Sequence, residues 1–503
     1  MNYMKRIILS FLSLFIFNFL SISQDLPNIV FIYADDLGYG DVSCYGATKI
    51  ITPNIDRIAK EGISFTNAHT ASATCTPSRF SLLTGEYAWR RKGTGIARGN
   101  ASLIMNPSHI TFPRVLQNAG YKTGIIGKWH LGLGDAAGPN WNGEIKPGPI
   151  EVGFDYSYIM AATLDRVPTV FIENHRIMNW KSGDPIEVNY DHKVGNAPTG
   201  KENPELLRMK PSNGHSNTIV NGISRIGWMT GGYEARWTDQ NIADTFTQRA
   251  INFIELNKQH PFFLYFASGD PHVPRDPNQR FVGKSGMGPR GDAILQLDWS
   301  VGQILQTLER LGLKNNTMVI FTSDNGPVVD DGYHDQAVEL LNGHTPWGPF
   351  SGGKYSIFEA GTRVPFIVSW PGKIPENKKS NALLSQVDML ASFASFTNQP
   401  FNKEEAIDSR NMVKTLLGKT KKGRNHLIED AGTLAIIQGY WKYIEPGDGQ
   451  AIDTFVNIKL GNSPLPQLYN LKNDEGEQNN LATRYPKKVK KLAAELEKVK
   501  NKK

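Results

Sequence analysis

Cysteine is scarce in this chain of 503 residues, which contains only Cys44 and Cys75. Two cysteines cannot form the dense disulfide framework that holds small secreted domains together. A single pair could still form a disulfide in an exported protein, but we expect none. Cys44 lies in a turn-rich stretch, and we interpret it as a structural or incidental residue.

Long apolar runs are absent after the first 23 residues, so no later segment approaches the ~20 residues needed to cross a membrane. Residues 1–23 combine Lys5 and Arg6, an apolar core at 7–20, and a small-x-small triplet at 21–23. This pattern is typical of a secretory signal peptide. The alternative is an uncleaved anchor, for which the core is short. No cysteine stands at the cleavage point to take a lipid. We therefore expect a periplasmic or secreted protein without stable membrane insertion.

The chain also lacks the broad positive charge of a nucleic-acid-binding protein, although its formal net charge is +7. Lys5 and Arg6 contribute two of these charges, and segment 487–503 carries eight lysines against Glu495 and Glu497. The rest of the chain is therefore close to neutral, at about −1. We expect no nucleic-acid partner. The lysine-rich end is predicted to be an amphipathic helix with a solvated face, and attraction to a polyanion is the less favoured alternative.

Repeats and low-complexity segments are absent, and the length suits a large α/β domain plus a smaller one. Four apolar, β-rich runs are predicted to be strands that end in polar residues, at 27–34, 122–127, 261–267 and 317–322. Helical patterns occur at 53–60, 112–119 and 292–311. Strands and helices in this order are typical of a doubly wound α/β fold. We predict a catalytic domain at 24–375 and, at 376–503, a C-terminal α+β subdomain with a small antiparallel sheet.

The stretch 75–85 is the centre of the functional interpretation. It reads as a loop that leads into a short helix, with Pro77 in the first turn and Cys75 beside the helix N-terminus. Free N–H groups there favour an anion, and Arg79 lies one turn further on the same face. The stretch therefore suits an oxyanion. The alternative is that Cys75 is a small, buried and inert residue.

Oxygen-bearing side chains that can bind hard cations follow two of the predicted strands. Asp35 and Asp36 follow the strand at 27–34, and Asp324 and Asn325 follow the strand at 317–322. Adjacent carboxylates repel one another unless a cation binds, and an all-oxygen set favours Ca²⁺ or Mg²⁺ over zinc. Capping aspartates in a turn are the alternative. Positive charge and proton transfer near this metal would come from Arg79, Lys128, His130, His272 and Lys354.

Segment 134–204 is rich in Gly, Pro and Asn and shows few periodic runs. Such a long insertion is usually a functional rim rather than part of the core. We expect substrate selection there, although an arginine in such a loop is more often simply solvated. The candidates for substrate binding are Asp165, Arg166, Asn174 and His175.

These stretches together resemble the type I, formylglycine-dependent sulfatases. Cys-Thr-Pro-Ser-Arg at 75–79, followed by Leu-Thr-Gly at 83–85, is similar to the signature of that family. Other family-like motifs occur in the family's order, at Asp35-Asp36, 127–130, His272, 323–326, 353–354 and 468–481. The resemblance covers nearly the whole mature chain. It implies an alkaline-phosphatase-like fold, in which helices flank a large mixed sheet and a smaller α+β subdomain follows.

The resemblance also implies a mechanism. A formylglycine-generating maturation enzyme would oxidise Cys75 to formylglycine (3-oxoalanine), whose hydrate attacks sulfur. One Ca²⁺ would bind the formylglycine at position 75 and the four oxygen ligands named above. Arg79, Lys128 and Lys354 would offset charge. His272 and Lys354 would protonate the leaving oxygen, and His130 would take the proton of the second hydroxyl so that sulfate is expelled.

The implied substrate is a sulfated oligo- or polysaccharide, because the chain most resembles exported bacterial polysaccharide sulfatases. These act on algal polymers such as ulvan or carrageenan, or on glycosaminoglycans. Two alternatives stay open. One is a phosphodiesterase or phosphonate hydrolase of the same superfamily, and the other is a non-catalytic polysaccharide-binding relic.

Overall fold

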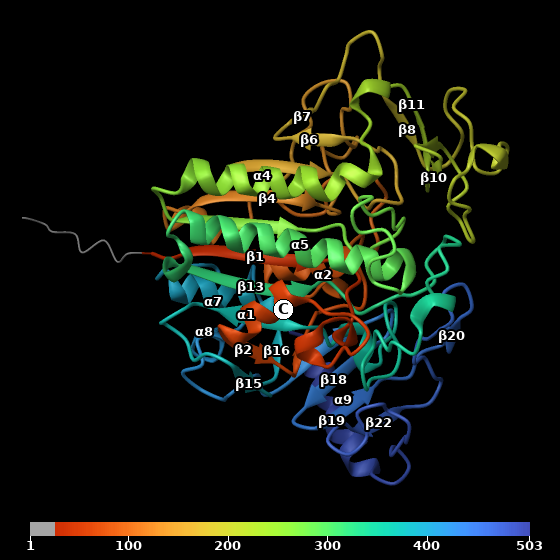
Figure 1. Cartoon of the computed structure of the whole chain (residues 1–503). Helices are drawn as coiled ribbons and strands as arrows, with labels where there is room; N and C mark the ends of the chain where they lie inside the picture. The colour runs from red at the N-terminus through yellow and green to blue at the C-terminus, as the bar shows by residue number, and fades with distance from the viewer. Residues whose placement is uncertain (1–25, 503) are drawn as a thin grey trace, which may run out of the picture.

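The computed structural model describes residues 26–502, so the predicted signal peptide lies outside the described residues. A mixed sheet of ten strands forms the centre of the protein (Figure 1). Its strands are β1 (Asn28–Ala34), β2 (Gly62–Phe65), β4 (Lys122–Lys128), β5 (Tyr156–Met160), β6 (Phe171–Glu173), β7 (Arg176–Ile177), β12 (Phe262–Ala267), β13 (Thr317–Ser323), β14 (Phe366–Ser369) and β15 (Lys378–Ser380). Their order is β15-β2-β14-β13-β1-β12-β4-β5-β6-β7.

The five central strands, from β13 to β5, run parallel to one another. On either side β14 and β6 are antiparallel to their inner neighbours. The carboxyl ends of the five central strands therefore meet at one edge of the sheet, where open α/β sheets place their ligands.

Alternate residues of the buried strand β1 face two separate cores. Ile29, Phe31 and Tyr33 belong to one, and the residues between them belong to the other. Helices α2 (Cys75–Thr84), α3 (Phe112–Asn118), α7 (Met389–Phe396) and α8 (Val413–Leu416) contribute to the first core. Helices α1 (Pro53–Lys60), α4 (Ile242–Asn257) and α5 (Gly288–Arg310) contribute to the second. The unbroken apolar run of β1 follows from burial on both faces.

Segment 134–204 is only partly a rim, and the sequence-based expectation was wrong for β5 to β7. These strands extend the main sheet, and four of the five residues of β5 are buried. A strand of five residues with one serine offers too short a pattern to separate from a loop. The small strands β8 (Glu187–Asn189), β9 (Ile219–Val220), β10 (Ile223–Ser224) and β11 (Trp228–Thr230) form two antiparallel pairs, β9 with β10 and β8 with β11, at the upper right of Figure 1.

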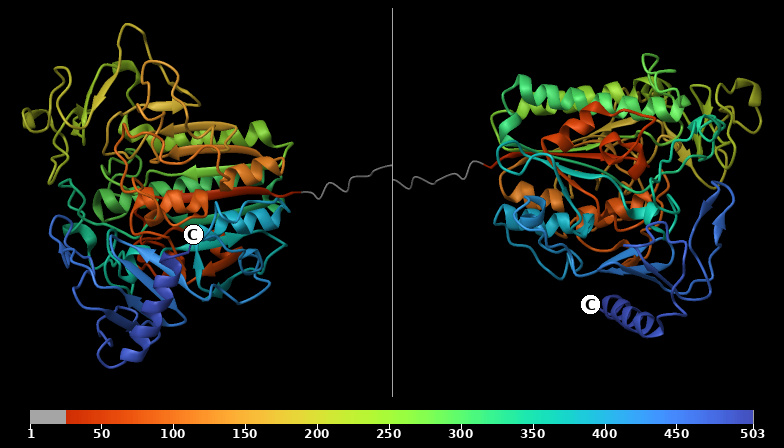
Figure 2. Two further views of the ribbon diagram at one scale, coloured as in Figure 1. Left: turned by 180° about the vertical axis from the view of Figure 1, so that it is seen from behind. Right: turned by 60° about the horizontal axis from the view of Figure 1, so that its bottom comes forward.

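The C-terminal sheet has four antiparallel strands in the order β17 (Leu427–Asp430), β18 (Leu434–Gln438), β19 (Trp441–Ile444) and β22 (Gln467–Asn470). Strands β18 and β19 are joined by a turn at Gly439, whose φ is 63°. The predicted lysine-rich helix is α9 (Pro486–Lys500), which lies near the C-terminal end of the chain (Figure 2). Its Leu492 and Leu496 are buried in the core that includes residues of this sheet.

The remaining short elements connect the main sheet with the C-terminal region. They are β3 (Ala68–His69), which pairs with β16 (Leu384–Ser385), α6 (Glu359–Thr362), and the pair β20 (Ile452–Asp453) and β21 (Ile458–Lys459). Strand β15 and helices α7 and α8 pack with the main sheet, and the domain boundary at residue 375 stays a prediction. Within residues 26–502, no helix has the length and apolar character of a membrane span.

Candidate active site

The predicted oxygen ligands meet because β1 and β13 are parallel neighbours with Ala34 opposite Ser323. The next residues of both strands therefore leave the sheet side by side. The Asp36 amide donates to Asp324 Oδ1 at 3.2 Å, and Asn325 Nδ2 donates to Asp36 Oδ1 at 2.7 Å. Asp35, Asp36, Asp324 and Asn325 are each at most 1% exposed.

Three cations pair with the three carboxylates of this group. Lys128, the last residue of β4, donates to both oxygens of Asp35 at 2.7 Å. Lys354 donates to Asp36 at 2.8 Å, and Arg79 donates to Asp324 Oδ2 through Nη2 at 2.8 Å. Burial opposes ionisation of Asp36, but Lys354, His272 and Lys128 together outweigh it and hold the pKa of this carboxyl well below its ordinary value. The structure brings these predicted residues together from five separate segments of the chain.

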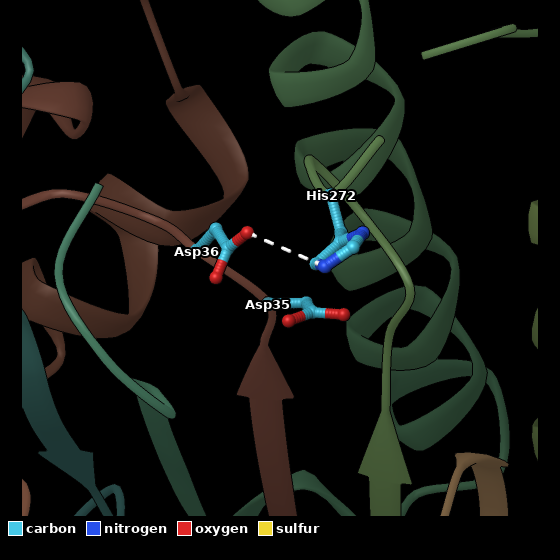
Figure 3. A group of neighbouring side chains, drawn as sticks. All are labelled: Asp35, Asp36 and His272. Carbon is cyan, nitrogen blue, oxygen red and sulfur yellow. Dashed lines mark ion pairs between the residues drawn. The ribbon is translucent and has the colours of Figure 1, made fainter. Parts of the chain in front are cut away.

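The donor set fits a hard divalent cation. Among the described residues, the buried oxygen Oδ1 of Asn325 has no hydrogen-bond partner, which is costly unless a ligand binds it. All four predicted ligands offer oxygen, as Ca²⁺ and Mg²⁺ require. Asp35 and Asp36 also lie close to His272, with ligand atoms within 4.8 Å of one another (Figure 3).

His272 follows β12, which lies next to β1. Its Nδ1 donates to the carbonyl of Val273 at 2.6 Å, which leaves Nε2 3.3 Å from the Lys354 ammonium. Burial and Lys354 lower the pKa of His272 to about 4, so the ring is neutral near pH 7 in this arrangement. A neutral ring with Nδ1 protonated accepts at Nε2, and Lys354 is the donor to it.

Cys75 begins helix α2, as predicted, and Gly85 ends that helix with a φ of 70°. The side chain is 2% exposed. Burial raises the pKa of the Cys75 thiol, although Lys128 and Lys354 oppose this. A protonated thiol is a poor nucleophile, so the position favours anion binding over ordinary thiolate chemistry. Cys44 and Cys75 are both free thiols.

His130 approaches the site from the turn after β4. His130 does not continue the extended backbone of β4, because its φ is 56°. Its Nε2 donates to the Ala97 carbonyl at 2.9 Å, and in residues 26–502 its buried Nδ1 has no partner. Burial, Lys128 and Arg166 hold the pKa of His130 well below its ordinary value. Nδ1 is therefore an available proton acceptor.

Asp165 and Arg166 lie beside this cluster, in the loop after β5. Arg166 Nη1 is 3.2 Å from Asp165 Oδ1, and His215 Nε2 is 2.9 Å from Asp165 Oδ2. Burial acts to lower the pKa of Arg166, but Asp165, with smaller contributions from Tyr190 and Cys75, raises it overall. The sequence reasoning missed His215, which stands in a stretch of Ser, Asn and Gly without periodicity. No local signal separates this histidine from a solvated one.

Asn174 and His175 lie away from the cluster, and their expected role in substrate binding stays a prediction. Strand β6 runs antiparallel to β5 and carries the chain back to the opposite edge of the sheet. There the Ser157 amide donates to Asn174 Oδ1 at 3.0 Å, and His175 pairs with Glu151 at 2.9 Å. Neither the strand direction nor this pairing can be read from a short polar loop sequence.

The fold and this site define a hydrolase of small oxyanion esters, with an acidic cluster whose donors suit a divalent cation, a buried cysteine and surrounding cations. The sulfatase family model matches residues 27–399, and the chain belongs to the sulfatase family. The predicted family, enzyme class and alkaline-phosphatase-like fold are confirmed.

The chain is 56% identical to an N-acetylgalactosamine-6-O-sulfatase of Bacteroides thetaiotaomicron over 476 residues, 94% of this chain and 93% of the relative. It is 32% identical to human arylsulfatase D, over 78% of this chain and 68% of that protein. A solved structure, described under the metabolism of multiple glycosaminoglycans by B. thetaiotaomicron, superposes with a TM-score of 0.94 at 55% identity. The match covers 95% of this chain and all of that one. These relatives support the assignment of this chain to the sulfatases.

Proposed function

We propose that this sulfatase removes the 6-O-sulfate from N-acetylgalactosamine units of glycosaminoglycans or their oligosaccharides. The 56%-identical relative supports this substrate over ulvan or carrageenan. The observation that carries the chemistry is the position of Cys75, at the N-terminus of a buried helix and within the electrostatic reach of Lys128 and Lys354.

The nucleophile would come from Cys75. A maturation enzyme would oxidise it to formylglycine, whose hydrated aldehyde supplies a hydroxyl for attack on sulfur. Asp35, Asp36, Asp324 and Asn325, with the oxidised residue 75, would hold Ca²⁺, which when bound offsets negative charge on the sulfate oxygens. The unpartnered Oδ1 of Asn325 is the feature that supports a metal there.

The remaining steps belong to side chains already in place. Arg79 and Lys128 are buried donors that stabilise negative charge at the nucleophile and the sulfate. Because His272 Nε2 is an acceptor in the neutral ring, Lys354 is the proton source for the leaving oxygen and His272 orients it. His130 takes a proton at Nδ1, since Ala97 fixes the hydrogen on Nε2.

Substrate recognition would involve Asp165, Arg166 and His215. Arg166 can bind a sulfate oxygen, and Asp165 can accept a hydrogen bond from a sugar hydroxyl that His215 also contacts. This arrangement offers a neutral sugar one acceptor and one donor beside the sulfate position. Asn174 and His175 have no part in it.

We also propose that the protein is exported by the signal peptide at 1–23, so that it meets its substrate in the periplasm or outside the cell.

The test is sulfate release from N-acetylgalactosamine 6-sulfate, compared with the matching 6-phosphate ester, by protein whose Cys75 has been converted. Peptide mass spectrometry establishes the conversion. We expect turnover of the sulfate ester and at least 100-fold less of the phosphate ester. Preference for phosphate would establish the phosphoester hydrolase instead. Binding of a sulfated polymer without turnover, despite converted Cys75, would establish the binding relic.

A further inference from the structure

Five cations at the start of α9 have no carboxylate partner in the described chain. They are Arg484, Lys487, Lys488, Lys490 and Lys491, of which all but the half-buried Lys488 are exposed. Within residues 26–502, the ion pairs of this helix involve only its second half, where Glu495 pairs with Lys498 and Glu497 pairs with Lys500. The five positive charges are therefore free to meet a ligand.

These cations occupy the end of the helix where they stabilise it least. Helix N-termini favour acidic side chains, and like charges three or four residues apart repel one another. The first turn of α9 has no acidic residue, and Lys487 lies three residues before Lys490 and four before Lys491. The opposite face of the helix buries Leu492 and Leu496, so the lysines face solvent. Helix stability does not explain this arrangement, whereas a negatively charged ligand does.

Two aromatic rings adjoin the cations. Trp441 begins β19 and Tyr485 precedes α9, and the two rings meet edge to face with their centroids 5.3 Å apart. Lys488 Nζ lies 5.3 Å from the centroid of the Trp441 ring, and Arg484 Cζ lies 5.5 Å from that of Tyr485. Tyr485 is 38% exposed. A merely solvated lysine face, which the sequence alone favoured, does not account for these rings.

The combination of cations and rings suits an acidic polysaccharide. Ammonium and guanidinium groups bind sulfate and carboxylate through charge-assisted hydrogen bonds, and clustered basic residues attract polyanions. Aromatic rings pack against the apolar face of a sugar. The glycosaminoglycan proposed as substrate carries sulfate and uronate groups along a chain of sugars, so its charge is complementary to these residues. They lie in the C-terminal region, below the main sheet in Figure 1, and none of them belongs to the catalytic cluster.

We propose that the five cations, Trp441 and Tyr485 form a second polysaccharide-binding site, which holds a sulfated glycosaminoglycan outside the catalytic site. The inference rests on the proposed function for the identity of the polymer. A chain bound at this surface keeps its other units at a high effective concentration near the catalytic residues. The surface therefore favours turnover of a polymer and has no effect on a single sulfated sugar.

Binding is measured on full-length Cys75→Ala protein, which cannot turn over the probe, chondroitin 6-sulfate. In this background, glutamine at the four lysines of the surface should raise Kd at least 10-fold and weaken its salt dependence, because fewer counterions are released. The matched control places glutamine at four exposed lysines in and after α8, namely Lys414, Lys419, Lys421 and Lys422. It removes the same charge and should keep Kd within 3-fold. Equal weakening in both variants would overturn the proposal.

Tyr485→Ser tests the contribution of the rings. Tyr485 is the N-cap of α9, and serine is a favoured N-cap, so the helix start is retained. We expect Kd to rise about 3- to 10-fold with an unchanged salt dependence. The control is Tyr233→Ser, at a tyrosine that is 61% exposed and follows β11, and it should keep Kd within 2-fold. Equal Kd values for the two variants would overturn the assignment to a sugar chain, as would tighter binding of duplex DNA or phosphatidylserine vesicles than of the probe.

Turnover by converted enzyme separates this proposal from the proposed function. The four glutamines should lower kcat/KM for chondroitin 6-sulfate at least 10-fold through KM and leave kcat/KM for N-acetylgalactosamine 6-sulfate within 2-fold. Equal losses on both substrates would show an effect on the fold and overturn the second site. Failure of the unsubstituted enzyme to release sulfate from either substrate would contradict the proposed function, while the binding measurements still decide the second site.

Discussion

Two buried clusters of similar composition have different roles in this protein. One contains Asp35, Asp36 and His272, and the other contains His69, Glu359 and Glu429, and each brings its ligand atoms within 4.8 Å of one another. Both lie among buried lysines. By composition alone, either cluster could be taken for a metal centre.

The second cluster already contains its cation. The Lys442 ammonium lies 3.1 Å from Glu359, 2.9 Å from Glu429 and 3.3 Å from Glu477, with all four side chains 0% exposed. Its residues come from α6, β17, β19 and the segment after β22, so the ion pairs connect the C-terminal sheet to the catalytic domain.

The first cluster differs because an acceptor oxygen beside it has no hydrogen-bond partner. Asn325 Oδ1 faces neither a hydrogen-bond donor nor a paired cation in the described chain, although three cations neutralise its three carboxylate neighbours. It also lies at the carboxyl edge of parallel strands, beside Cys75. An acidic cluster is thus a candidate site only when an acceptor stays free and the position is one where ligands bind.

The largest expected effect separates the two cysteines. Cys75→Ala removes the precursor of the nucleophile, and we expect kcat to fall by at least about 10⁴-fold, as for other nucleophile deletions. Cys44→Ala should keep kcat within 2-fold, because Cys44 lies outside the cluster. Sulfate release by the two purified variants measures the difference. Comparable losses in both would contradict the assignment of the site.

The second prediction removes the cation of the non-catalytic cluster. Lys442→Met leaves three buried carboxylates without their partner, and we expect the free energy of unfolding to fall by about 3–5 kcal/mol. The control Lys498→Met removes a lysine whose side chain is 76% exposed and should change it by less than about 0.5 kcal/mol.

Urea unfolding monitored by tryptophan fluorescence gives the free energy of unfolding of both variants. A Lys442→Met variant as stable as the control would show that this cluster does not hold the two regions together.

The third prediction concerns metal binding and needs no activity measurement. Ca²⁺ at 100 times its dissociation constant should add about 2.7 kcal/mol to the free energy of unfolding. Asn325→Ala should abolish most of this gain, whereas Glu429→Gln, in the other cluster, should retain it. Thermal unfolding in Ca²⁺ and in chelator distinguishes them. Repeating the measurement with Mg²⁺ in place of Ca²⁺ tests the choice of ion. If Ca²⁺ stabilised both variants equally, the metal would bind at another position.

The smallest expected effect is a pH dependence of the Lys442 cluster. Burial raises the pKa of Glu477 to about 8, with Lys442 opposing and Glu359 adding to the rise. A raised pKa in the folded state gives a stabilisation that is complete below about pH 4, the unfolded value, and is lost as pH rises through 8. Stability should therefore fall between these pH values.

Glu477→Gln cannot ionise, so it should flatten the decline in the free energy of unfolding by at most about 1.4 kcal/mol per pH unit. Urea unfolding at intervals from pH 5 to pH 8 gives the slope for both proteins. An unchanged slope in Glu477→Gln would assign the pH dependence to other groups.

The sequence by itself determined four strands of the central sheet (β1, β4, β12 and β13), the helix that begins at Cys75, and the residues that follow β1 and β13. These features depend on local rules. A doubly buried strand needs an apolar run, a helix start favours certain residues, and polar side chains gather where parallel strands end.

Only the tertiary structure decided which of the remaining polar residues share the site. Strand β6 runs antiparallel to β5, so His175 lies away from the site. A loop far away in the chain places His215 beside Asp165, and the left-handed backbone conformation of His130 directs this residue towards the cluster. These outcomes depend on strand direction, backbone dihedral angles and contacts between residues far apart in the chain. Hydrophobic periodicity reports only which face of a segment is buried, so it cannot specify the partner that the segment meets.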